Sequence, residues 1–564
     1  MTKLTFPNNL PPTSGMHPDF RSRFSGWQLG MALPDTLDGL LSGLTALAQD
    51  NPGCNAVAHG MALWGVQFHP LSSKLAQWAH TLSASGLHLP DHLARCLVQT
   101  VAAPEIDTAD ATALDTWHSL VRQGDRPTLL RFLNVSLRDS SKGLSWLGKL
   151  WTDLIHLGRP EVARAALDMV PWNDATAPLM ERMDAEFAFH CQDPETALHK
   201  VESLDPEAWG LWRAYAGAEL LLRMERRNEA LGVLSFLWKA APWHVNLTLK
   251  LYDLYNPAPL ADDTEAGDAA VLLYSWNKAE LLGDTLKSLT RSRLGSAPVF
   301  ALDNGSTDAT ADVLRQAQDR FGADRFHIET LPVNVGAPAA RNWLLSLPEV
   351  QARPFAAFLD DDVVLPTDWL LHLLGVSKAH SDVGVVGCRI TSASAPFGLQ
   401  SADYNMFPTP PREPEPGRLP NRVMVFDNCA GSVDTGLFTY SRPCLSVSGC
   451  CHLVSMRAVA KAGGFDLRFT PSQFDDLDRD MRSAMEGLPA VYTGGLAVRH
   501  VQHSSLAKSQ TVRQIGHVMG NKFKLDAKYS DEQLIKLGED NKDRLWDDLE
   551  RKHAFLVQRL ELTA

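Results

Sequence analysis

Three adjacent carboxylates are the residues of this chain with the clearest chemical potential. Asp360, Asp361 and Asp362 directly follow the apolar run 355–359. An apolar run of this length predicts a buried parallel strand, which puts the three acids at its carboxyl end, where open α/β sheets bind ligands. Neighbouring carboxylates repel one another unless a cation joins them, and Mg²⁺ or Mn²⁺ combines carboxylate oxygens with phosphates and water. The triplet therefore indicates a metal-bound nucleotide, and the alternative is an acidic turn in water.

Further polar clusters follow other expected strands. The run 269–275 ends at Ser275 and leads into a turn, and a second run, 298–303, ends at Asp303. The segment 334–342 then enters a helix. Because the carboxyl ends of parallel strands meet at one edge of a sheet, these clusters and the acidic triplet should gather there.

The elements that must position these residues fall into two unlike halves. Residues 1–255 have apolar positions at helical spacing, whereas short β-branched runs alternate with amphipathic helices over 269–505. A Pro-, Gly- and acid-rich linker, 256–268, separates them, and a charged helical tail follows over 506–564. The sequence thus predicts a multidomain protein, with an all-α N-terminal region and an α/β domain.

The helical half contains a weak repeat. Glu161, Glu195 and Glu229 lie at an even spacing of 34 residues, each near the start of a helical segment. This period is that of tetratricopeptide repeats, so residues 150–255 resemble such an array, whose concave surface commonly binds peptides. The alternative is an ordinary helical bundle.

Composition limits the class of protein. The 564 residues are 45% hydrophobic, which suits two or three globular domains, and the net charge of −13 argues against a general binder of nucleic acid. The N-terminus lacks the pattern of a signal peptide, and no run of about 18 apolar residues predicts a transmembrane segment. We therefore expect a soluble, cytoplasmic protein whose eight cysteines are reduced thiols.

In their order along residues 269–505, these motifs resemble the inverting family 2 glycosyltransferases, which have a GT-A (Rossmann-like) fold. The resemblance implies that Trp276 stacks on uracil, Asp303 pairs with the base and Arg341 makes a further base contact. The family's Asp-x-Asp motif corresponds to Asp360 and Asp362, with Asp362 the direct ligand of Mn²⁺ or Mg²⁺. The implied donor-binding residues are Ser275, Trp276, Asp303, Arg341, Asp360 and Asp361.

Each of these roles has an alternative. Trp276 could be a core residue, Asp303 could stabilise a turn, and Arg341 could face solvent.

The resemblance extends to an acceptor half. The segment 463–466, Gly-Gly-Phe-Asp, leads to Asp475 and Asp476, and this register makes Asp476 the catalytic base. The family has Glu where Asp475 stands, so the register leaves Asp475 open as the base. His500 matches the residue that closes the family's domain and supplies a further metal ligand or a diphosphate contact, and it fits better than His503.

The implied reaction is transfer of a sugar from a uridine or thymidine diphosphate donor to a hydroxyl group. The fusion to repeats resembles bacterial enzymes that glycosylate flagellin or other surface proteins, and so suggests a protein acceptor bound by the helical repeats. The alternatives are extension of a lipid-linked or lipopolysaccharide glycan, an inactive scaffold, and a nucleotidyltransferase. The irregular segment 391–443, Pro-rich at 408–420, is either an acceptor contact or a disordered surface loop.

Overall fold

The protein forms two compact units. The computed structural model describes residues 19–30, 33–106, 110–392, 398–407, 421–429, 431–501 and 512–560. The first unit comprises Met1–Leu254 with Ser432–Gly436 and His553–Ala564, and the second comprises Tyr255–Gly431 with Leu437–Lys552. The Pro-rich stretch 408–420 and His503 lie outside the described residues.

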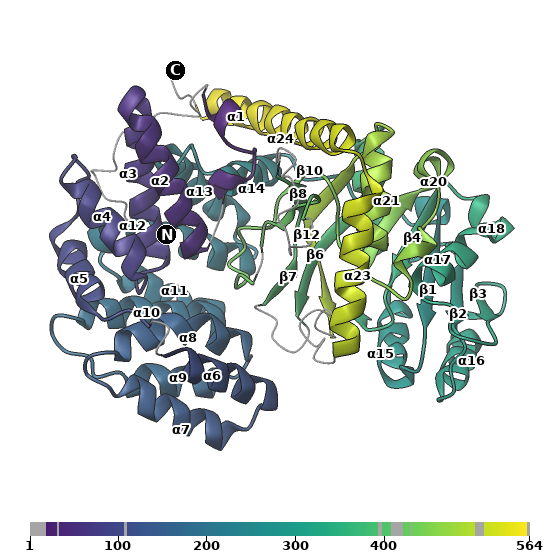
Figure 1. Cartoon of the computed structure of the whole chain (residues 1–564), viewed down its shortest axis with the longest axis horizontal. Helices are drawn as coiled ribbons and strands as arrows, with labels where there is room; N and C mark the ends of the chain where they lie inside the picture. Colours follow the sequence, from purple (N-terminus) through teal and green to yellow (C-terminus); the bar gives the residue numbers. More distant parts are fainter. Residues whose placement is uncertain are drawn as a thin grey trace. The chain divides into compact units, whose positions relative to one another are not determined.

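The first unit is helical (Figure 1). Its helices are α1 (Phe20–Arg23), α2 (Pro34–Asp50), α3 (Gly53–Phe68), α4 (Ser73–Ser83), α5 (Asp91–Ala102), α6 (Ala111–Gln123), α7 (Arg126–Leu137), α8 (Gly143–His156), α9 (Pro160–Met169), α10 (Ala177–Cys191), α11 (Pro194–Ser203), α12 (Pro206–Arg223), α13 (Arg227–Ala240) and α14 (Val245–Tyr255).

The 34-residue spacing in this unit marks helix starts. Glu161, Glu195 and Glu229 lie in the first turns of α9, α11 and α13, where a carboxylate interacts favourably with the helix dipole. Each helix from α8 to α12 contacts the next one along the chain. The assignment of these helices to tetratricopeptide repeats stays a prediction.

The second unit is built on a mixed sheet, with strand order β10-β12-β6-β11-β4-β1-β2-β3. β5 pairs with β12 and β7 with β6, while β8 and β9 form a separate pair. The strands are β1 (Ala269–Ser275), β2 (Val299–Asp303), β3 (Phe326–Thr330), β4 (Phe355–Leu359), β5 (Val363–Val364), β6 (Val385–Ser392), β7 (Leu399–Ser401), β8 (Tyr404–Met406), β9 (Val425–Asp427), β10 (Ser441–Cys444), β11 (Cys451–Ser455) and β12 (Ala490–His500).

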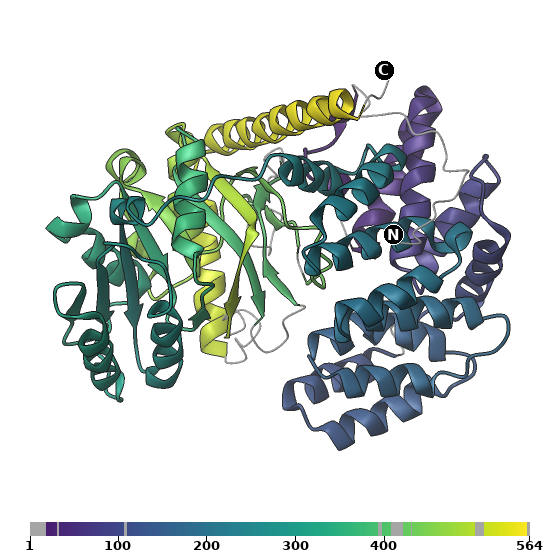
Figure 2. The ribbon, with the colours of Figure 1, turned by 180° about the vertical axis from the view of Figure 1, so that it is seen from behind.

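Helices cover both faces of this sheet (Figures 1 and 2). One face packs on α15 (Ala279–Leu289), α16 (Thr310–Phe321) and α19 (Trp369–Ala379) in a large apolar core. On the other face α17 (Ala337–Leu345) contacts β1 and β2, and α20 (Met456–Ala462) contacts β11 and α21 (Asp475–Met485). The short α18 (Pro348–Gln351) follows α17. The fold class predicted from the sequence, a helical region joined to an α/β domain, is therefore confirmed.

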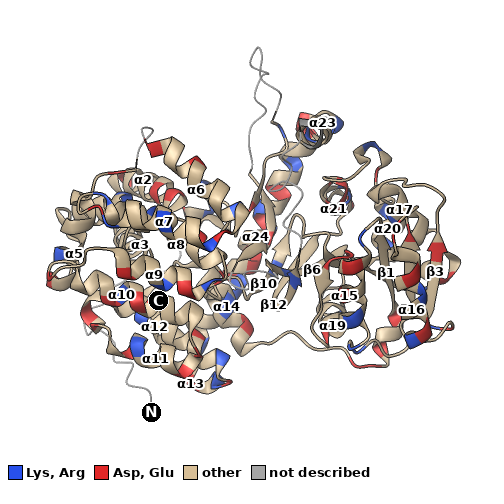
Figure 3. Cartoon of the chain, turned by 90° about the horizontal axis from the view of Figure 1, so that it is seen from below, with Lys and Arg blue, Asp and Glu red and all other residues tan. Residues whose placement is uncertain are grey.

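Helices from the C-terminal tail complete the second unit. They are α23 (Val512–Lys528) and α24 (Asp531–Arg559), whose charges of both signs are interspersed (Figure 3). Leu525 and Leu537 pack with Phe469 and Met481 in a second apolar core. Most of the tail is thus part of the α/β unit.

A buried ion pair reinforces this attachment. The ammonium group of Lys528 lies 2.7 Å from Asp466 Oδ2 and 2.5 Å from Asp478 Oδ1. The Asp478 side chain is fully buried, and the hydroxyl of Tyr529 also donates to it, at 2.7 Å. Lys528 therefore neutralises a carboxylate that water cannot reach.

None of the helices among the described residues is both long enough and apolar enough to cross a membrane. All eight cysteines are free thiols. Cytoplasmic localisation stays a prediction.

Replacing Lys528 should loosen the α/β unit. We expect Lys528→Met to lower the local free energy of opening of α21 and α23 by about 3 kcal/mol, because Asp478 Oδ1 loses its buried cation while Arg482 holds only Oδ2 of the same carboxylate. Hydrogen exchange of these helices should then be roughly a hundredfold faster. The matched control is Lys536→Met, since Lys536 is 74% exposed and pairs with the exposed Asp540. Equal exchange in both variants would show that the pair contributes nothing.

Candidate functional site

The sheet brings the predicted polar residues to one edge. β1 and β2 run parallel with Ser275 opposite Asp303, and β4 runs parallel to β1 and ends at Leu359, just before the acidic triplet. β11 runs antiparallel to β4, so its start meets the end of β4. The backbone N–H of Asp360 donates to the carbonyl of Cys450 at 2.9 Å. Cys450, which is 90 positions further along the chain, therefore lies beside the triplet.

Lys278 neutralises two of the three acids. Its ammonium group lies 2.9 Å from Asp361 Oδ1 and 3.2 Å from Asp362 Oδ2, and the hydroxyl of Ser275 donates to Asp361 Oδ2 at 2.7 Å. Burial raises the pKa of Asp361 to about 6, although Lys278 opposes this shift. Asp361 is therefore held within the protein by Ser275 and Lys278.

His500 is the second partner of Asp362. Its Nε2 lies 3.0 Å from Asp362 Oδ1, and its Nδ1 lies 2.7 Å from Gln400 Oε1 and 3.8 Å from Cys450 Sγ. Burial raises the pKa of Asp362, but the hydrogen bond and charge of His500 outweigh it and hold that pKa below its usual value. For His500 burial has the opposite effect and lowers the pKa. The neighbouring Cys450 and Asp362 outweigh burial and raise the pKa of His500 to about 11. The imidazole is thus fixed on both of its edges.

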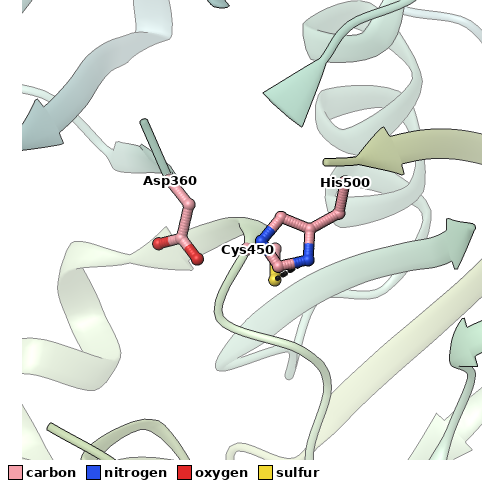
Figure 4. A group of neighbouring side chains, drawn as sticks. All are labelled: Asp360, Cys450 and His500. Carbon is pink, nitrogen blue, oxygen red and sulfur yellow. Dashed lines mark hydrogen bonds between the residues drawn. The ribbon is translucent and has the colours of Figure 1, made fainter. Parts of the chain in front are cut away.

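Asp360, Cys450 and His500 form a group that fits a metal ion. One ligand atom from each residue lies within 4.8 Å of the other two, and Figure 4 shows the side chains turned toward one another. Two ligands of one ion, each at about 2.0–2.3 Å, can be no more than about 4.6 Å apart, so a small adjustment would let one ion reach all three. Asp362, in contact with His500, offers a further carboxylate oxygen at the same place.

Arg341 joins the acidic triplet to the acceptor half. Its guanidinium lies 2.7 Å from Asp475 Oδ2 and 3.6 Å from Asp360 Oδ1, and only 6% of the residue is exposed. It also lies over the rings of Tyr274 and Phe465. The side chain does not face solvent, which removes that alternative, and its predicted contact with a base stays a prediction.

Asp475 and Asp476 differ in their surroundings. Asp475 is buried and held by Arg341, and burial raises the pKa of Asp475 to about 6 although Arg341 opposes this shift. Asp476 is half-buried at the start of α21. A β-carbon at Gly449 would meet Asp476 Oδ2 at 2.7 Å and Arg341 Nη2 at 3.3 Å, so the glycine leaves room beside this carboxylate. Asp476 is therefore the more accessible of the two acids.

Trp276 and Asp303, two of the residues predicted to meet a nucleoside base, have different environments. The Trp276 side chain is 49% exposed, so it is not a core residue. The next residue, Asn277, has a positive φ of 52°, and it is tied to the turn after β2, whose Thr307 N–H donates to Asn277 Oδ1 at 2.7 Å. Asp303 Oδ1 accepts from Ser306 N–H at 2.8 Å, so this oxygen has the turn role, and no hydrogen bond to Oδ2 is found among the described residues.

Some residues of this site were not expected from the sequence. Lys278, Gln400 and Cys450 contact predicted site residues. Lys278 could have been found, because a buried acidic triplet needs a cation and this lysine follows the neighbouring strand. Cys450 and Gln400 had no such signal, since only the pairing of β11 with β4 and of β7 with β6 places them.

Residues 270–433 match the family model "Glycosyl transferase family 2". With the sheet described above, this match identifies the second unit as a GT-A type α/β domain. The chain is also similar to validoxylamine A glucosyltransferase from Streptomyces hygroscopicus subsp. jinggangensis (strain 5008), with 33% identity over 122 residues. That alignment covers 21% of this chain and spans 28% of the length of the relative.

Solved structures show weaker likenesses. The mannosyltransferase PcManGT from Pyrobaculum calidifontis, in complex with GDP-Man and Mn²⁺, has a TM-score of 0.34 and 15% identity, covering 59% of this chain and 88% of that one. TarS from S. aureus has a TM-score of 0.30 and 14% identity, covering 50% and 43%. TM-scores of this size carry no argument about function.

Removing Lys278 should increase the effect of a divalent cation. We expect Lys278→Met to unfold at a lower temperature than the wild type in chelator, because Asp361 and Asp362 lose their shared cation. Added Mn²⁺ should then raise the unfolding temperature more than in the wild type, because the ion no longer meets a competing charge.

The matched control is Lys287→Met, since Lys287 pairs with the exposed Asp284. Thermal denaturation with and without Mn²⁺ provides the measurement. A smaller rise in Lys278→Met than in the wild type would contradict this electrostatic account.

Proposed function

We propose that this chain is a metal-dependent inverting glycosyltransferase that moves a sugar from a nucleoside diphosphate to a hydroxyl group. The observation that carries the proposal is that Asp360, Asp362 and His500 lie together at the carboxyl edge of the sheet. Asp360 and Asp362 belong to the segment that matches the family model, and His500 follows it in the chain. The similarity to a glucosyltransferase agrees with this reaction class.

The donor would lie along this edge of the sheet. Trp276 offers an exposed aromatic face for a base, and Asp303 has one oxygen left to accept from the imide N–H of uracil or thymine. Asp362 and His500 would hold the cation, together with Asp360. When bound, the cation neutralises charge on the departing diphosphate.

The chain's own residues would perform the transfer of the proton. Asp476 accepts the proton of the acceptor hydroxyl while that oxygen attacks the anomeric carbon on the face opposite the diphosphate. The new C–O bond forms as the bond to the diphosphate oxygen breaks, so one displacement inverts the configuration. Arg341 holds Asp475 beside the base, and the lack of a side chain at Gly449 lets the carboxylate of Asp476 lie close to the backbone there.

For the acceptor we propose a protein bound by the helical unit. The support is the series of contacting helices whose starts recur about every 34 residues, which is a layout that commonly binds peptides. The alternative is a lipid-linked or lipopolysaccharide glycan. Label from the donor should appear in protease-sensitive material for a protein acceptor and in the lipid extract for the alternative.

A donor screen tests the reaction class. We expect the wild type to hydrolyse one uridine or thymidine diphosphate sugar slowly in Mn²⁺ and not in chelator, because water can replace the acceptor. Asp362→Asn should abolish both this hydrolysis and the Mn²⁺-dependent binding of the nucleoside diphosphate, measured by calorimetry. The proposal fails if no nucleotide sugar is bound or cleaved, or if Asp362→Asn retains both properties.

A pair of conservative variants tests the base. Asp476→Asn keeps the shape of the side chain but removes the proton acceptor, so turnover should fall by roughly 10²–10⁴-fold while donor binding persists. Asp475→Asn should be milder in turnover but less stable to heat, because Arg341 loses a buried partner. Loss of transfer in Asp475→Asn with most activity retained in Asp476→Asn would assign the base to Asp475 instead.

A further inference from the structure

Cys450 occupies a position that the reaction proposed above does not require. The thiol is half-buried, its sulfur lies 3.8 Å from His500 Nδ1, and Ser448 donates a hydrogen bond to it at 3.2 Å. Its neighbour Cys451 begins β11 and lies in the apolar core, and Cys450, in the turn before the strand, packs partly against the same core. The sulfur of Cys450 nevertheless faces His500 and Ser448.

The sheet holds this thiol rigidly against the acidic triplet. Cys451 pairs with Leu359 in the antiparallel register, and the backbone of Cys450 accepts the N–H of Asp360 at 2.9 Å. Gln400 holds the imidazole of His500 through Nδ1, and Nε2, which contacts Asp362 Oδ1 at 3.0 Å, would bind the ion once its proton is lost. The positions of the sulfur, the carboxylate and the imidazole are therefore set by backbone pairing and by one hydrogen bond.

The mixture of donor atoms has a chemical consequence. A site made only of carboxylates and water suits Mg²⁺, whereas sulfur and imidazole ligands favour softer ions such as Zn²⁺ and, among ions of intermediate character, Co²⁺. One ligand atom each from Asp360, Cys450 and His500 lies within 4.8 Å of the others, close to the separation that one ion requires. The alternative is that Cys450 only accepts a hydrogen bond from His500.

We propose that Cys450 is a sulfur ligand of the divalent ion in this site, and that it makes the site bind Co²⁺ and Zn²⁺ in preference to Mg²⁺. The inference rests on the proposed function, because it concerns the ion that would accompany the nucleotide sugar. The thiol proton passes to solvent as the sulfur binds the ion, so the number of electrons on each partner is unchanged. No oxidant or reductant takes part.

Cobalt spectroscopy tests this proposal directly. Co²⁺ added to the full-length wild type, with and without uridine diphosphate, should produce sulfur-to-cobalt charge-transfer absorption in the near ultraviolet. Cys450→Ser and Cys450→Ala should both lose this band. In Cys450→Ser the ratio of the Mg²⁺ and Co²⁺ dissociation constants, measured by competition, should fall at least about tenfold. The matched control is Cys191→Ser, since Cys191 is the other half-buried thiol and lies in the first unit.

The outcomes separate this inference from the proposed function. If Co²⁺ binds but the wild type shows no band, or if the metal preference of Cys450→Ser is unchanged, Cys450 is not a ligand, while the proposed function stands. If the band appears as expected but no nucleotide sugar is cleaved, Cys450 is a ligand and the proposed function fails. If neither Co²⁺ nor Mn²⁺ binds with or without the nucleotide, both are wrong.

Discussion

The repulsion among carboxylates at one edge of the sheet is the constraint on which the rest of the site depends. The acidic triplet, Asp475 and Asp476 converge there, and the cations that face them are Lys278, Arg341 and His500. Each of these cations comes from a different part of the chain, so the negative charge is partly offset only when the α/β unit is folded. Negative charge remains in excess, and that excess is what makes the edge suitable for a divalent ion and for the diphosphate bound to it.

The topology of the sheet determines which residues share this edge. The parallel strands β4, β1 and β2 are neighbours in the sheet, and the residues that follow each of them lie at this edge. The antiparallel strand β11 lies between β4 and β6, so it begins at the same edge. Gly449 and Cys450, which directly precede β11, therefore lie there too. The mixed sheet therefore joins donor-half and acceptor-half residues without a long loop between them.

Charge pairs also explain why two neighbouring acids can differ in role. Asp475 is buried against Arg341, whereas Asp476 is half-buried beside a glycine. Arg341 occupies one carboxylate oxygen of Asp475 and burial keeps the rest of that side chain from a substrate, so Asp476 is the acid that an acceptor hydroxyl could reach. The same guanidinium reaches toward Asp360, so the acceptor and donor halves are coupled through one side chain.

The sequence by itself determined the fold class and the residues at the ends of parallel strands, because apolar runs followed by acids place Asp303 and the triplet without knowledge of any partner. It also brought His500 and Asp476 into the candidate site through motif order. The tertiary structure showed that Lys278 pairs with Asp361 and Asp362, and it alone decided that Arg341 pairs with Asp475 and that Cys450 lies beside His500. Those contacts depend on strand pairings between segments far apart in the chain, and such pairings leave no local periodicity in the sequence that could predict them.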